Sequence, residues 1–71
     1  MKSRVKEILN ERGIKIDEFA MSYQKSAGCT GVEAARWALL AVEGAELPLG
    51  VAVRIASVLG EPLRDVFGLD E

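Results

Sequence analysis

Apolar residues in this chain recur every three or four positions, the spacing of a helix that buries one face. The first such segment covers about residues 4–12, where Val5, Ile8 and Leu9 share a face. Ser3 is placed to cap its start, and a glycine follows its last residue. This pattern predicts a first helix of about two turns.

A second helix is predicted from Ile16 to about Lys25. Asp17 and Glu18 lie near its start, where negative charge interacts favourably with the helix dipole. Its expected apolar stripe consists of Ile16, Phe19, Ala20 and Tyr23. Residues 26–31 contain two glycines among small side chains, which predicts a loop after this helix.

A third helix is predicted over about residues 31–42. Thr30 is placed to cap it, and Glu33 lies three positions later, as in a capping box. The expected inward face consists of Ala35, Ala38, Leu39 and Val42. We therefore expect the remaining positions of this helix to face outward.

Two prolines introduce the last two predicted helices. Pro48 suits the first turn of a helix that ends before Gly60, and Pro62 suits the first turn of a short final helix. The inward residues of the final helix are expected to be Leu63, Val66 and Phe67. No strand pattern of any length is present, so the sequence predicts an all-α fold of five short helices in a single domain over residues 1–71.

Composition argues against catalysis. The chain has no histidine and one cysteine, Cys29, so no usual proton shuttle, disulfide framework or multi-cysteine metal site can be assembled from it. We expect a protein that is not an enzyme, has no cofactor or metal, and works in a reducing cytoplasm. The longest apolar run is also far below the roughly 20 residues that a membrane-spanning helix needs.

The net charge of −2 is unevenly distributed. Residues 1–36 hold seven basic and five acidic groups, whereas residues 37–71 hold two basic and six acidic groups. Cations supply most of the non-specific affinity of proteins for nucleic acids. Any surface for a polyanion is therefore expected in the first half of the chain.

Two segments resemble lambda-repressor-like helix-turn-helix domains of the Cro and Xre type. The first is LNERGI at residues 9–14 followed by DEFA at residues 17–20. The second is RIASVLGEPLRDVF at residues 54–67, which is similar to the last two helices of that family. The resemblance covers about residues 4–68. Between its two ends, residues 21–30 add several residues to the usual turn.

The resemblance implies a regulator that binds double-stranded DNA as a homodimer, with two reading helices about 34 Å apart. In that family the third helix lies in the major groove and the start of the second contacts phosphate. Carried over by position, Lys15 and Ile16 would lie near the DNA backbone. The outward face of the reading helix would consist of Glu33, Ala34, Arg36, Trp37 and Leu40.

Six of the candidate contact residues also have a simpler interpretation. Arg36 would bind guanine, or else pair with Glu33 three residues earlier. Trp37 would anchor DNA or a protein partner, or else belong to the core. Four further residues flank the turn and would contact phosphates, or else are ordinary surface groups: Lys15, Lys25, Ser26 and Thr30.

A second function fits the same scaffold. The third helix concentrates alanine, leucine and tryptophan where a DNA reader is usually polar, and exposed apolar patches usually mark partner surfaces. The alternative hypothesis is therefore a protein-interaction module with little or no specific DNA binding. In it, the segment from Ala34 to Val42 would pack on a copy of itself or on another protein.

Overall fold

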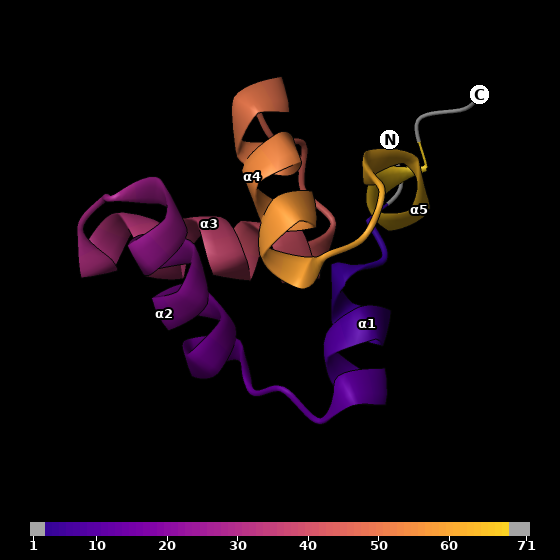
Figure 1. The fold of residues 1–71 in the computed structure, drawn as a ribbon, viewed down its shortest axis with the longest axis horizontal. Coiled ribbons are helices and arrows are strands. Elements are labelled where there is room, and N and C mark those ends of the chain that lie inside the picture. Colours follow the sequence, from indigo (N-terminus) through magenta and orange to yellow (C-terminus); the bar gives the residue numbers. More distant parts are fainter. Residues whose placement is uncertain (1–2, 69–71) are drawn as a thin grey trace.

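The computed structural model describes residues 3–68, and this part of the chain is helical and contains no strand. The helices are α1 (Val5–Arg12), α2 (Ile16–Ala27), α3 (Gly31–Glu43), α4 (Leu49–Leu59) and α5 (Leu63–Phe67). In Figure 1, α2 and α3 form one side of the molecule, α1 and α5 form the other, and α4 lies between them. The prediction of five short helices is confirmed.

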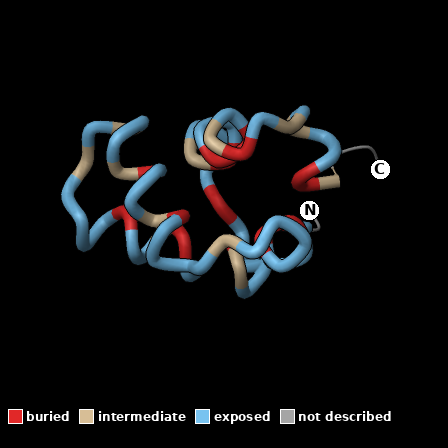
Figure 2. Tube along the Cα trace, turned by 60° about the horizontal axis from the view of Figure 1, so that its bottom comes forward, coloured by how far each residue is buried: buried red, intermediate tan, exposed pale blue. Residues whose placement is uncertain are grey.

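One core joins all five helices. Figure 2 marks the buried positions of the chain in red. Its largest fully buried side chains are Phe19, Phe67, Ile55, Val5 and Val66. The described residues include no buried polar or charged side chain in this core. The elements are therefore held together by apolar packing, with polar contacts at the rim.

Polar contacts fix α1 to the C-terminal helices at both of its ends. At the start, the backbone N–H of Arg4 donates to the carbonyl of Val66, with 2.7 Å between N and O. At the end, the Arg12 guanidinium donates to the carbonyl of Leu59 at 2.6 Å and pairs with Glu61. These contacts tie both ends of α1 to the C-terminal part of the chain.

Ser3 does not occupy the cap position expected for it. Arg4 is the N-cap residue of α1, and no side chain caps it. The Ser3 hydroxyl accepts a bond from the N–H of Val5 at 3.3 Å and donates one to the carbonyl of Ala41 at 2.8 Å. Ser3 therefore ties the start of α1 to α3 across 38 positions of sequence.

No helix within residues 3–68 is long and apolar enough to cross a membrane. The longest of the five, α3, has 13 residues.

Candidate nucleic-acid interface

A three-residue turn joins α2 to α3. Gly28 ends α2 with φ of +68°, and its N–H donates to the carbonyl of Gln24 at 2.8 Å. The left-handed backbone at Gly28 reverses the chain at a position where a Cβ would add strain. Thr30 then caps α3, because its hydroxyl accepts a bond from the N–H of Glu33 at 3.1 Å. The predicted Thr30 cap is confirmed.

The residues expected to lengthen the turn instead lengthen α2. Helix α2 continues to Ala27, two residues beyond the predicted end, and Gly31 already belongs to α3. The predicted loop over residues 26–31 is therefore too long. Tyr23 is only 5% exposed, and Ala27 lies one turn further along the same face and packs against the core. This apolar face keeps the added residues helical.

Helix α3 is rotated by about one residue from the predicted orientation. Its buried residues are Ala34, Ala38 and Ala41, whereas Ala35 is exposed and Leu39 is 50% exposed. The expected outward position of Ala34 and the expected inward positions of Ala35 and Leu39 are therefore wrong. The distance between packed helices depends on the side chains at the contact, so three alanines let α3 approach its neighbours closely.

The outward face of α3 consists of Val32, Glu33, Ala35, Arg36, Leu39 and Glu43, all of which are exposed. Arg36 lies near the middle of this face. Within residues 3–68 the ion pairs are Arg4 with Glu7 and Arg12 with Glu61, so Arg36 is not paired with Glu33 there. The guanidinium of Arg36 is therefore available to an external anion.

Trp37 and Leu40 are partly buried and pack against the core. The family pattern placed both on the outward face of α3, whereas the alternative for Trp37 was the core, against which it does pack. The rotation of α3 carries them to the edge of that face, where each shows solvent only part of its side chain. The exposed charged residues of this face are therefore Arg36, Glu33 and Glu43.

The two lysines lie at opposite ends of α2. Lys25 is exposed in its last turn and lines a shallow hollow of about 310 Å³ with Glu18, Met21 and Ser22. Lys15 is exposed at the N-cap position. Because ten residues of sequence separate them, they do not form one cluster of charge.

The start of α2 carries its own carboxylates. The backbone N–H of Lys15 donates to Oε1 of Glu18 at 3.0 Å, and the N–H of Glu18 donates to Oδ1 of Asp17 at 3.1 Å. These carboxylates occupy the donors that a phosphate would use at this helix end and offset the charge of Lys15. Lys25 and Arg36 are the better placed cations of the candidate interface.

Ser26 contacts α4. The Arg54 guanidinium donates to the carbonyl of Ser26 at 2.9 Å and to its hydroxyl oxygen at 3.3 Å. The carbonyl belongs to the last turn of α2, where backbone acceptors lack partners within the helix. Arg54 thus fixes the end of α2, next to the turn, against α4.

Tyr23 and Cys29 lie inside the α2–turn–α3 unit. Burial raises the pKa of the Tyr23 hydroxyl above its ordinary value, and the nearby Cys29 thiol raises it further. Cys29 is partly buried against the core. Within residues 3–68, no group of three or more acidic, cysteine or histidine side chains is placed to hold a metal ion.

A hollow that the sequence did not reveal lies between α2 and α3. Its volume is about 260 Å³, and it is lined by Ile16, Asp17, Ala20, Ala35 and Leu39. Ile16 is 40% exposed here, although it was expected in the buried stripe of α2. The sequence does hold a signal for the orientation of α3, namely the size of its side chains. The alanine face is the one that packs closely against the rest of the molecule.

Comparison of the chain with protein-family models, curated proteins and solved structures found no match.

Proposed function

We propose that this protein is a small DNA-binding regulator of the helix-turn-helix class, which inserts α3 into the major groove and acts as a homodimer. The observation that carries the proposal is the α2–turn–α3 unit, in which a capped 13-residue helix presents an exposed, unpaired Arg36 outward. An arginine on such a helix has the reach and the two parallel donors that read guanine.

Two exposed cations of the α2–turn–α3 unit support this assignment. Lys25 lies two residues before Ala27, the last residue of α2, and Arg36 lies on the outward face of α3. A phosphate contact by Lys25 would set the register of the protein on the duplex, whereas a base contact by Arg36 would supply specificity. The resemblance of residues 54–67 to the closing helices of lambda-repressor-like domains points the same way.

The direct test is selection of duplexes from a random-sequence pool at low salt, followed by affinity measurements on the selected site. Arg36→Ala should weaken binding to that site by roughly 5- to 150-fold, which corresponds to about 1–3 kcal/mol for a bidentate base contact. Arg64→Ala is the matched control, because Arg64 is an exposed arginine on α5, at the other side of the molecule (Figure 1).

Enrichment of a sequence together with a selective loss in Arg36→Ala supports the proposal. No enrichment at low salt, or equal losses in Arg36→Ala and Arg64→Ala, contradicts it.

A second candidate function is supported by the apolar hollow between α2 and α3. Leu39 is 50% exposed and Ile16 is 40% exposed at this hollow, and the side chain of a protein partner would bury both. This function predicts that Leu39→Ser abolishes partner binding and leaves folding intact. The DNA-binding function predicts instead that Arg36→Ala weakens the affinity for the selected duplex more than Leu39→Ser does.

A further inference from the structure

Few groups on the outward face of α3 can form hydrogen bonds with a base. Helix α3 contains no asparagine, glutamine, serine, threonine or lysine. Arg36 is its one cation, and Glu33 and Glu43 are its carboxylates. The other exposed side chains of this face are apolar, namely Val32, Ala35 and Leu39. If α3 enters the major groove, these three side chains therefore need apolar partners there.

Val32 is the most exposed large apolar side chain within residues 3–68. It is 80% exposed, whereas Leu39 is 50% exposed and also lines the hollow between α2 and α3. Val32 is the second residue of α3, and in helix-turn-helix complexes the first residues of the reading helix contact the base edges. Val32 is therefore the apolar side chain best placed to reach a base.

One base presents a methyl group in the major groove. Thymine carries this group at C5, whereas the edges of the other three bases present hydrogen-bond donors and acceptors. Contact between a valine side chain and the thymine methyl group removes apolar surface of both from water, which is favourable. Thymine is thus the base that fits the Val32 side chain.

The spacing along α3 sets where this thymine lies relative to the guanine of Arg36. Val32 and Arg36 are four residues apart, so they lie on one side of the helix, about 6 Å apart along its axis. Successive base pairs of DNA are about 3.4 Å apart. The two contacts are therefore separated by one or two base pairs.

We propose that the DNA bound by α3 contains a thymine within two base pairs of the guanine bound by Arg36, and that Val32 contacts the methyl group of this thymine. The inference rests on the proposed function and names the sequence that α3 reads. Arg36 supplies the hydrogen bonds and Val32 the apolar contact, so the two side chains recognise different bases.

Replacing thymine with uracil in the selected duplex tests this contact, because uracil keeps the base pair and lacks only the methyl group. The wild-type protein should bind the duplex with uracil at the predicted position about fourfold more weakly, the value for burial of about one carbon group. Uracil in place of a thymine outside the bound site should have no effect. Both duplexes are titrated at the same low salt concentration, because phosphate contacts depend on salt.

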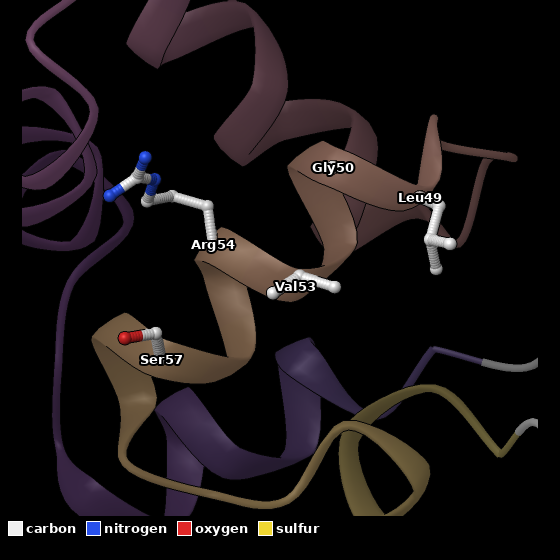
Figure 3. A pocket seen from close by; sticks show the side chains of 5 residues that line it. All are labelled: Leu49, Gly50, Val53, Arg54 and Ser57. Atoms are coloured by element: carbon white, nitrogen blue, oxygen red, sulfur yellow. The ribbon is translucent and has the colours of Figure 1, made fainter.

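Val32→Ala shows whether the effect depends on this side chain. Alanine favours helix more than valine does at an exposed position, so the variant should remain folded. It should bind the thymine duplex about fourfold more weakly than the wild type does, and it should bind the thymine and uracil duplexes equally. Val53→Ala is the matched control, because Val53 is an exposed valine on α4 and not on the reading helix (Figure 3). This variant should keep the wild-type preference for thymine.

Enrichment of a site with a thymine at this distance, together with loss of the preference for thymine in Val32→Ala alone, supports the inference. A selected site without such a thymine, or equal binding of both duplexes by the wild type, overturns it and leaves the proposed function standing. A preference for thymine that Val32→Ala retains overturns the assignment to Val32. Failure of the selection to enrich any sequence overturns the inference and the proposed function together.

Discussion

At the scale of single residues, the glycines that flank the α2–α3 turn have opposite roles. Gly28 has φ of +68°, a backbone conformation that costs an L-residue about 1–2 kcal/mol, whereas Gly31 is the first residue of α3 and has helical backbone. A Cβ on Gly31 would lie 3.6 Å from the side-chain oxygen of Gln24, which is ordinary contact. The same substitution should therefore have opposite effects at two positions three residues apart.

Gly28→Ala should lower the free energy of unfolding by about 1 kcal/mol, because it forces alanine into the left-handed region. Gly31→Ala should raise it by about 0.5 kcal/mol, because alanine lowers the entropy of the unfolded chain and favours helix. Urea denaturation of both variants measures these changes. Two changes of the same sign would contradict a left-handed backbone at Gly28 and a helical backbone at Gly31.

Tyr23 gives the molecule a pH dependence that can be measured directly, because it is the only tyrosine of the chain. Burial raises the pKa of its hydroxyl in the folded state. The unfolded chain therefore loses this proton first as pH rises above about 10, and the stabilisation present at lower pH is lost there. Absorbance of tyrosinate should appear at higher pH in the native protein than in urea, and titration at the same pH in both would contradict burial of Tyr23.

At the scale of helices, α1 is joined to the C-terminal end of α4. Arg12 of α1 reaches both the Leu59 carbonyl in the last turn of α4 and the Glu61 carboxylate just beyond it. The Arg12 and Glu61 side chains are 39% and 35% exposed, so the ion pair alone contributes less than about 1 kcal/mol. The bond to the carbonyl satisfies a backbone acceptor that has no partner in its own helix.

Arg12→Ala should lower the free energy of unfolding by about 1–2 kcal/mol, because it removes both contacts. Glu61→Ala removes only the ion pair and should cost less than about 1 kcal/mol. Chemical denaturation distinguishes the two variants. Equal losses would mean that the carbonyl contact contributes nothing.

Helix positions were predictable from the sequence to within about two residues, because apolar spacing and terminal glycines mark them locally. The orientation of α3 could not be predicted in this way. Ala35 and Leu39 are four residues apart, and so are the buried Ala34 and Ala38, so spacing does not choose between the two faces. The choice between the two faces is made by the close approach of α3 to α2, which is a tertiary effect. For the same reason the exposed side of Leu39 and the hollow beside it were missed.

The candidate contact residues show the same difference between local properties, which the sequence predicts, and tertiary contacts, which it does not. Arg36 and Lys25 are exposed as charged residues usually are, and their accessibility follows from their chemistry. The bond between Arg54 and Ser26 joins residues 28 positions apart, so no local pattern predicted it. Sequence alone therefore assigned Ser26 to the DNA surface without its contact to α4.

At the scale of the whole molecule, the two exposed cations of the proposed DNA surface, Lys25 and Arg36, both belong to the α2–turn–α3 unit. In the proposed function, α3 of this unit enters the major groove and two copies of the chain bind the DNA together. The described part of the chain measures 33 × 25 × 20 Å. Two copies side by side are thus of the size needed for reading helices about 34 Å apart, one turn of DNA.

The most direct test of the central claim is the salt dependence of DNA binding, measured by titrating a labelled duplex that carries the selected site. If Lys25 and other cations contact phosphates, the logarithm of the association constant falls linearly with the logarithm of salt concentration. Lys25→Ala should then reduce the magnitude of the slope by about 0.9, the value for one phosphate contact. Binding that is absent at low salt, or that does not change with salt, would contradict the account.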